Sequence, residues 1–355
     1  MNNLVSRQNT PDTCLEGNFY NGKHFAARVS AVPVLFTLSV VGSFSPLVAA
    51  YSKKFKLPDW LFTGIRYFGS GVIIATGFIH LMAEAAAALS NKCLGPPFTD
   101  YPFAEGIALI AVFFIFFFDI VAHYKLSNKA KARIDNDKHG NLPIGFESVT
   151  GEASTNIHQS REPTEEEDQE SNASRKSSDT EINERNLSKL ESLYQQILNC
   201  VVLECGIVLH SIFVGLSLAI AGDEFVTLYI AIGFHQLFEG LGLGTRFATT
   251  QWPKGKRYVP WLMSLAYSLT TPFACGIGLI VRETYPAGSR TSLITTGTFD
   301  ATCAGILIYN SIAELMAFDF MYSGDFRDKP IKKLLFAYIY LSLGAFAMAF
   351  IGKWA

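Results

Sequence analysis

The sequence predicts an all-α protein that crosses a membrane about eight times, because its apolar residues form long runs of the length that spans a bilayer. Of its 355 residues, 49% are hydrophobic and only 17% are charged. Soluble domains usually carry roughly 25% charged residues. The composition and the clustering of apolar residues together favour a polytopic membrane protein over a soluble domain.

The expected spans fall into two groups with a long polar loop between them. They cover residues 31–51, 64–90, 104–124, 194–221, 224–246, 258–281, 297–320 and 332–352. The predicted organisation is an extracellular segment at 1–30, three transmembrane helices within 31–124, a loop at 125–193 and five transmembrane helices within 194–355. Residues 1–30 lack the short apolar core of a cleavable signal peptide, so the first span is expected to insert by itself.

The loop at 125–193 differs sharply in composition from the spans. It contains the stretch REPTEEEDQESNASRKSSDTEINERN, which is rich in Glu, Asp, Ser and Asn. Such a stretch cannot bury enough apolar surface to order itself. We therefore predict a disordered cytoplasmic loop.

The positive charges of the short loops predict the orientation of the chain. Lys and Arg gather after the first, third, fifth and seventh spans, and they are sparse in the other loops. Because positive loops stay in the cytoplasm, both termini are expected to face the outside or a lumen. Cys14 and Cys93 then lie on the outer side, where disulfides persist, and a bridge between them is a hypothesis.

Three histidines within apolar spans are the main candidates for chemistry. His210 lies in the fourth span, whereas His235 and His80 are each followed four residues later by a carboxylate, Glu239 and Glu84. Residues four apart share one face of a helix, so each pair points toward one place. A charged group in hydrocarbon costs roughly 2.5–3.5 kcal/mol or more, and such groups therefore mark a functional site by default.

Imidazole and carboxylate ligands predict the type of ion. This ligand set suits Zn²⁺ and also Fe²⁺, Mn²⁺, Co²⁺ or Ni²⁺, whereas Ca²⁺ and Mg²⁺ prefer oxygen ligands alone. The alternative is that the three histidines are structural and separately hydrogen-bonded. No basic patch with interleaved aromatic residues appears, so nucleic acid is not an expected partner.

Other ionisable residues within or next to the spans predict a path for an ion through the bilayer. The candidates are Glu84, Glu105, Asp119, His123 and Glu314. For Asp119 and His123 an alternative is equally good, because polar side chains near a membrane surface also extend into the headgroup region.

With these motifs the chain resembles the ZIP family of divalent-metal transporters, in particular its fungal and plant branch of zinc and iron importers. The resemblance rests on GVIIATGFIHLMAEA, LECGIVLHSIFVGLSLA, AIGFHQLFEGLGLG, SLTTPFACGIG and AGILIYNSIAELMAFDF. It implies a bundle of eight helices with outward termini and a metal centre between the fourth and fifth spans.

The resemblance also assigns ligands. It implies a primary metal site of His210, His235 and Glu239, with His80 as a contributor. Secondary-site positions match Ser211, Gln236 and Thr271, where the family tends to carry Asn, Asp and Glu. Because Gln and Thr replace two carboxylates, we expect one tightly held metal and a weak or vacant second subsite.

The implied function is import of zinc into the cytosol by elevator-like alternating access, with zinc as the transported substrate and no prosthetic group. Fe²⁺ or a broader set of divalent ions is the alternative substrate. The expected location is the plasma membrane, with a vacuolar membrane as the alternative. The oligomeric state stays open, a homodimer included.

Two other classes of function compete with transport. An intramembrane enzyme would need an HEXXH motif or a nucleophile elbow, and the sequence contains neither. A membrane metal sensor would bind the ion without moving it. The polar residues from Glu105 to Glu314 favour a path over a closed pocket.

Overall fold

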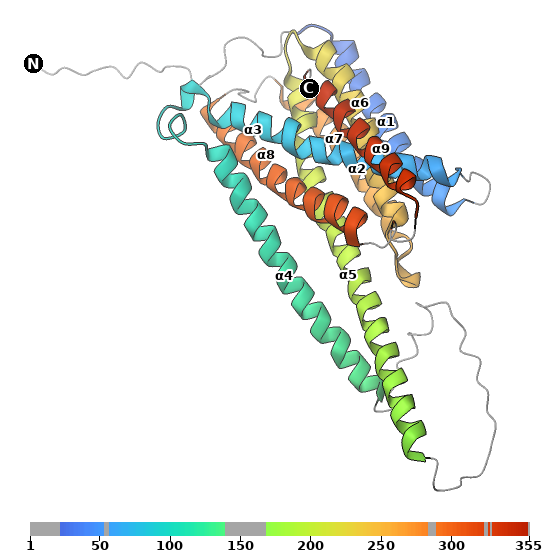
Figure 1. Cartoon of the computed structure of the whole chain (residues 1–355). Helices are drawn as coiled ribbons and strands as arrows, with labels where there is room; N and C mark the ends of the chain where they lie inside the picture. Colours follow the sequence, from blue (N-terminus) through green and yellow to red (C-terminus); the bar gives the residue numbers. More distant parts are fainter. Residues whose placement is uncertain are drawn as a thin grey trace, which may run out of the picture. The chain divides into compact units, whose positions relative to one another are not determined.

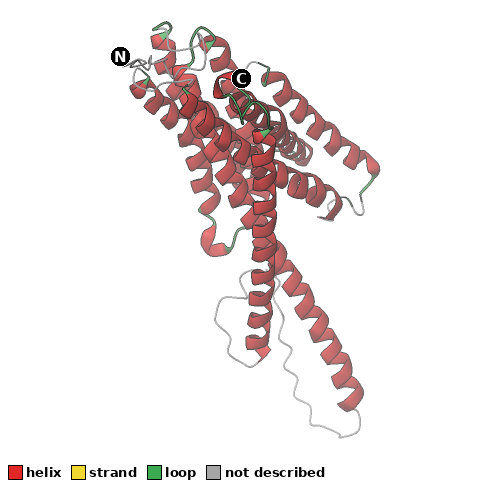
Figure 2. Ribbon diagram, turned by 90° about the vertical axis from the view of Figure 1, so that its left-hand side faces the viewer, coloured by secondary structure: helices red, strands yellow, loops and turns green. Residues whose placement is uncertain are grey.

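The computed structural model describes residues 22–52, 57–138, 168–282, 289–322, 326 and 329–353. This part of the chain contains helices and no strand (Figure 2). Eight of the described helical segments are long and apolar enough to cross a membrane. The prediction of an all-α polytopic membrane protein is confirmed.

The eight candidate spans agree with the predicted ones within a few residues at most ends. They cover Phe25–Tyr51, Asp59–Leu94, Phe103–Lys125, Leu193–Ile220, Phe225–Thr249, Val259–Val281, Arg290–Met321 and Ile331–Ile351. The second and seventh are the longest, with 36 and 32 residues, and both contain a stretch of π-helix.

The described elements follow in one order. They are α1 (Phe25–Tyr51), α2 (Asp59–Ala75), η1 (Thr76–Leu81), α3 (Met82–Leu89), η2 (Lys92–Leu94), α4 (Phe103–Lys138), α5 (Asp168–Ile220), α6 (Phe225–Thr249), η3 (Lys254–Lys256), α7 (Val259–Val281), α8 (Arg290–Asn310), η4 (Ser311–Tyr322) and α9 (Ile331–Ile351). The π-helices η1 and η4 continue α2 and α8 without a break.

Local sequence explains where several helices begin. Pro58 and Pro330 precede α2 and α9, where the fixed φ of proline fits and its missing N–H leaves no bond unmade. The Ser289 hydroxyl accepts a hydrogen bond from the Ser292 amide at 3.1 Å and caps α8.

The chain divides into two compact units. The first contains residues 1–116, 200–249 and 260–355. Within it, α6 packs against α1 and α2, α2 packs against α9, and α3 with η1 packs against α8 (Figure 1). Through these contacts η1 and α6 each pack against other helices of this unit.

Glycines let α2 and α9 approach closely. A Cβ atom at Gly71 would overlap the carbonyl oxygen of Leu341, and one at Gly344 would overlap the carbonyl oxygen of Phe68. In a bilayer the association of helices depends on such close packing, because lipid is as apolar as the side chains.

Arg28 fixes the end of α5 against α1. Its side chain is fully buried and donates hydrogen bonds to the carbonyl oxygens of Ala219 and Gly222, at 3.1 and 3.3 Å. The guanidinium also lies 4.3 Å from the centre of the Phe225 ring. These contacts satisfy carbonyl groups that a helix end leaves without an intrahelical partner.

The second unit contains residues 117–199 and 250–259. Here α4 continues to Lys138 and α5 begins at Asp168, so both helices extend into the segment 125–193 that its composition predicts to be disordered. The difference has a physical reason, because Glu, Lys, Gln, Arg and Ala in these stretches are good helix formers. Residues 139–167 lie outside the described part, and their disorder stays a prediction.

The proposed cysteine bridge is only partly visible. Cys93 is disulfide-bonded. Cys14 lies outside the described residues, so the pairing of these two cysteines stays a prediction.

Candidate metal site

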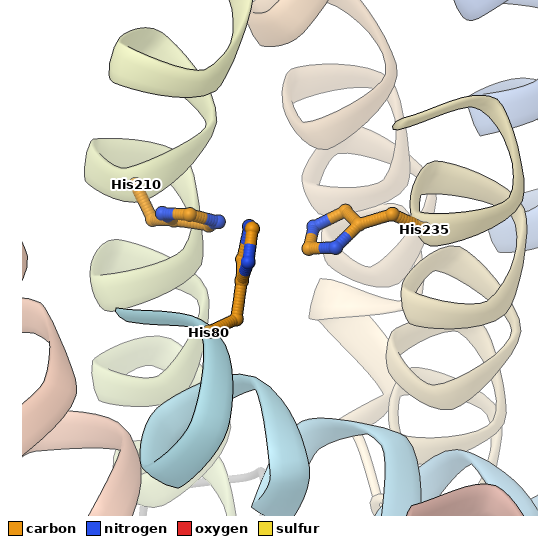
Figure 3. Close-up of side chains that lie close together, drawn as sticks. All are labelled: His80, His210 and His235. Atoms are coloured by element: carbon orange, nitrogen blue, oxygen red, sulfur yellow. The ribbon is translucent and has the colours of Figure 1, made fainter. Parts of the chain in front are cut away.

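Three imidazoles from three different helical elements meet in the first unit. His80 comes from η1, His210 from α5 and His235 from α6, and their rings point toward one another (Figure 3). One ligand nitrogen from each lies within 4.8 Å of the others, so the group can hold a metal ion. The fold therefore brings His80 next to two histidines that lie more than 100 residues away from it in the sequence.

The backbone around His80 is unusual. The π-helix η1 spans Thr76–Leu81, and His80 lies near its end. Single π turns inside α-helices occur often at functional sites, because the wider turn changes the direction of the side chains that follow. His80 is 4% exposed, and its ring centre lies 5.3 Å from that of His210 and 5.0 Å from that of His235.

Two of the three imidazoles have a carboxylate four residues further along the same helix. Glu239 Oε2 lies 3.4 Å from His235 Nε2, and Glu84 Oε1 lies 3.6 Å from His80 Nδ1. Both pairs have the spacing of four residues that placed them on one face in the sequence. Glu239 is fully buried, whereas the Glu84 side chain is 41% exposed. Only the pair of His235 and Glu239 is therefore fully buried.

Many polar atoms of this cluster have no hydrogen-bond partner among the described residues. These atoms are His80 Nε2, both ring nitrogens of His210 and His235, and Glu239 Oε1. Buried polar groups are normally paired, and a group without a partner needs an explanation such as an ion. Three imidazoles and one carboxylate are a ligand set that suits Zn²⁺ or another borderline divalent ion. The cluster is therefore chemically suited to a metal.

The positions matched to a secondary site are occupied by a hydrogen-bonded pair. Gln236 Nε2 donates to Thr271 Oγ1 at 2.6 Å and to Ser39 Oγ at 3.2 Å. Ser211 is also fully buried, and its hydroxyl has no hydrogen-bond partner in the described part of the chain. None of these three side chains carries a charge, so they offer a divalent ion little electrostatic attraction.

Tyr267 contacts both the ligand cluster, through Glu239, and the positions matched to a secondary site, through Gln236. Its hydroxyl donates to the Gln236 carbonyl oxygen at 2.8 Å and lies 3.5 Å from Glu239 Oε2. This fully buried side chain on α7 thus holds α6 at the turn that carries Gln236 and Glu239.

The remaining residues of the predicted path are dispersed. Glu105 is exposed in the first turn of α4, and Glu314 lies in η4 with its side chain outside the described part. Asp119 and His123 line a surface pocket with Gln195 in the second unit, where Gln195 Nε2 donates to Asp119 Oδ1. Their part in a path stays a prediction.

Sequence reasoning missed two buried carboxylates of the first unit. Asp300 on α8 is 1% exposed, and its Oδ1 lies 4.0 Å from His210 Nδ1. Glu204 on α5 is 6% exposed, and neither of its carboxyl oxygens has a hydrogen-bond partner in the described residues. The signal that selected the histidines, an ionisable group inside an apolar span, was also available for these two residues.

Comparison with known proteins gives a consistent result over almost the whole chain. The family model described as "ZIP Zinc transporter" matches residues 25–352. The chain is 37% identical to Zinc-regulated transporter 2 of Saccharomyces cerevisiae, with all of both chains covered. It is 35% identical to Zinc-regulated transporter 1 of the same yeast, with 96% of this chain and 90% of the relative covered.

The name of a plant relative gives a different substrate. Fe(2+) transport protein 2 of Oryza sativa is 30% identical, with 99% of this chain and 93% of the relative covered. Since the ZIP family consists of transporters, the protein is a transporter rather than an enzyme. The buried imidazole cluster, the eight candidate spans and the match over residues 25–352 lead to one conclusion: the chain belongs to the ZIP family of divalent-metal transporters.

Proposed function

We propose that the protein moves zinc into the cytosol through a site formed by His80, His210, His235 and Glu239. One observation carries the proposal: three imidazoles and a carboxylate lie together, buried and without hydrogen-bond partners for most of their polar atoms. Zinc is the first choice because imidazole-rich sites bind it more strongly than Mn²⁺ or Fe²⁺. The names of the two yeast relatives point in the same direction.

Iron(II) is the second candidate substrate. It accepts the same nitrogen and oxygen ligands as zinc. The name of the rice relative, Fe(2+) transport protein 2, is the specific observation in its favour. The competition experiment below separates the two ions.

The site holds one ion tightly under this proposal. The uncharged Ser211, Gln236 and Thr271 form a weak or vacant second subsite, since Gln236 and Thr271 already bond to each other. The Glu239 carboxylate offsets part of the ion's charge and the neutral imidazoles donate lone pairs, and transport requires that the bound ion can still be released.

Alternating access of the elevator type is the proposed mechanism, with α5 and α6 moving against a scaffold. Its support lies in the surface of α6, where a Cβ at Gly242 would overlap Gly69 and one at Gly244 would overlap the Ser43 carbonyl oxygen. Small residues let helix backbones approach closely in a membrane, and we infer that contacts with few protruding side chains let α6 slide. Glu84, Glu105, Asp119, His123 and Glu314 are proposed to line the route of the ion.

The proposed orientation has both termini outside, because Lys and Arg gather in alternate loops. The proposed location is the plasma membrane. Transport of zinc from a vacuole to the cytosol would use the same orientation.

Radiolabelled zinc uptake tests the function in cells that lack their own zinc importers. Wild-type protein should restore uptake, His210→Ala should abolish it at equal surface expression, and His24→Ala should behave as wild type, because His24 is exposed at the start of α1. Iron, manganese and copper added as competitors then rank the ions. Absence of uptake by surface-localised wild-type protein would contradict the proposal.

A further inference from the structure

Asp300 is a buried carboxylate that the proposed ligand set does not use. It lies on α8, only 1% exposed, and neither of its carboxyl oxygens has a hydrogen-bond partner among the described residues. A buried carboxylate without a partner is costly, because it loses its hydration and gains nothing in return. Such a residue in the middle of a helix bundle needs a compensating interaction.

A proposed metal ligand lies close to Asp300. Asp300 Oδ1 lies 4.0 Å from Nδ1 of His210, and His210 is fully buried. Neither ring nitrogen of His210 has a hydrogen-bond partner in the described part of the chain. A small rotation of either side chain would bring the two atoms to the distance of roughly 2.7–3.2 Å at which N–H donates to oxygen.

The geometry separates the two nitrogens of His210 by role. Its ring extends from α5 toward the rings of His80 and His235 (Figure 3), while Nδ1 is the nitrogen near Asp300. A neutral imidazole carries a proton on one nitrogen and a lone pair on the other. If Nδ1–H donates to Asp300, the lone pair is on Nε2, where it can bind an ion shared with the other two imidazoles.

Asp300 also changes the charge of the loaded site. Three neutral imidazoles and the Glu239 carboxylate leave a divalent ion with one uncompensated positive charge. Glu84, the carboxylate beside His80, is 41% exposed. Asp300, next to His210, is a buried carboxylate and can therefore offset the remaining charge. Uncompensated charge in a low-dielectric interior is strongly unfavourable, so this balance favours binding of a divalent ion over an empty site.

We propose that Asp300 is a positioning residue of the metal site: it accepts a hydrogen bond from Nδ1–H of His210, directs Nε2 toward the ion and adds a buried negative charge beside the ligands. The proposal rests on the function proposed above. It adds a residue from α8 to a site otherwise built from η1, α5 and α6.

Zinc affinity of the purified protein tests the proposal, measured by competition with a chromophoric chelator. Asp300→Ala should weaken zinc binding roughly 10- to 100-fold, the usual loss when the outer partner of a metal-bound histidine is removed. Asp300→Glu should recover part of the affinity, and Asp300→Asn should lie between the two, since it keeps an acceptor but no charge. Asp100→Asn makes the same chemical change at an exposed loop residue and should bind as wild type.

A double-mutant cycle with His210 separates positioning from a general structural role. If Asp300 acts mainly by positioning His210, then Asp300→Ala should cost clearly less zinc affinity in the His210→Ala background than in the wild type, and the remaining loss should reflect the missing charge. In uptake experiments the KM of the Asp300→Asn variant should rise, while the maximal rate per transporter at the surface should change less. Asp300→Asn keeps the size of the side chain. If the alanine variant does not fold, the zinc affinity of Asp300→Asn tests the proposal.

Three results would overturn the proposal. If Asp300→Asn and Asp300→Ala both bind zinc as tightly as the wild type, Asp300 is not a positioning residue, and the proposed function is unaffected. If the losses of zinc affinity in Asp300→Ala and His210→Ala are fully additive in the double variant, Asp300 does not act through His210. Wild-type protein that neither binds nor transports zinc would instead overturn the proposed function, and this inference with it.

Discussion

The side-chain amide of Gln236 donates to the hydroxyl oxygen of Thr271 at 2.6 Å, and this bond joins α6 to α7 within the membrane-spanning bundle. Both side chains are fully buried and uncharged. A divalent ion at this place would have to break the bond and would meet no carboxylate from either residue. We therefore expect the pair to act as a contact between helices and to bind a second ion weakly or not at all.

Restoring charge at this pair should create a second ion site. We expect the double variant Gln236→Asp with Thr271→Glu to bind two zinc ions per chain where the wild type binds one, because two carboxylates supply the attraction that the native pair lacks. Equilibrium dialysis with metal analysis measures the ratio. Thr271→Val is the uncharged control and should stay at one, and two comparably tight ions in the wild type would contradict the account.

Removal of His80 tests whether η1 contributes a ligand. We expect His80→Ala to weaken zinc binding by more than the roughly 10- to 100-fold that follows loss of an outer hydrogen-bond partner, because a ligand itself is lost. His24→Ala removes an exposed imidazole and serves as the control. Chelator competition on purified protein gives both affinities. Equal zinc affinity of His80→Ala and wild type would exclude His80 from the ligand set.

The long apolar runs and the polar residues within them made most of the site predictable from sequence. The apolar runs predicted all eight spans. His210 and His235 were recognisable as site candidates because ionisable side chains are rare in the hydrocarbon part of a membrane. The contact of His80 with these two histidines depends on the fold, which brings η1, α5 and α6 together.

The parts that escaped prediction depend on packing between helices. Asp300 lies near His210 only because α8 packs beside η1 and α3, and α5 meets α8 where Gly206 lies against Leu307. The π turn at Thr76–Leu81 cannot be read from hydropathy, because it changes the path of the backbone and not the pattern of apolar residues. Composition also underestimated the helical extent of 168–193, since polar helix formers resemble disordered sequence.

The contact between α2 and α9 should be sensitive to a single methyl group. A Cβ at Gly71 would overlap the carbonyl oxygen of Leu341, so Gly71→Ala should cost about 1–3 kcal/mol or more by forcing the two backbones apart. Thermal melting of the purified protein in detergent measures the loss. Gly276→Ala on α7 is the matched control, because no atom lies within 4 Å of the added Cβ there. Equal melting temperatures for the two variants would refute this packing argument.

Asp319 should matter for stability through its two arginine partners. Its carboxylate oxygens lie 3.0 Å from Arg66 Nη2 and 3.0 Å from Arg246 Nη1, and its side chain is only 3% exposed. Asp319→Ala removes the counter-charge of two largely buried guanidinium groups, and loss of one partner of a buried pair typically costs about 3–5 kcal/mol.

The exposed pair of Lys23 and Asp223 supplies the comparison. It has a similar distance of 3.1 Å, but its side chains are 66% and 71% exposed. Asp223→Ala should therefore change stability by no more than about 1 kcal/mol. Melting curves of both variants against wild type give the ranking, and an Asp319→Ala effect as small as that of Asp223→Ala would show that the buried pairs contribute little.

Zinc flux into liposomes that contain only the purified protein shows whether the ion passes through the buried imidazole cluster. We expect saturable flux for wild type and for His24→Ala, and loss of flux for His235→Ala at equal protein incorporation, because the His235 ring offers a nitrogen that could bind the ion in this cluster. Wild-type flux by His235→Ala would contradict the claim that the transported ion passes through this site.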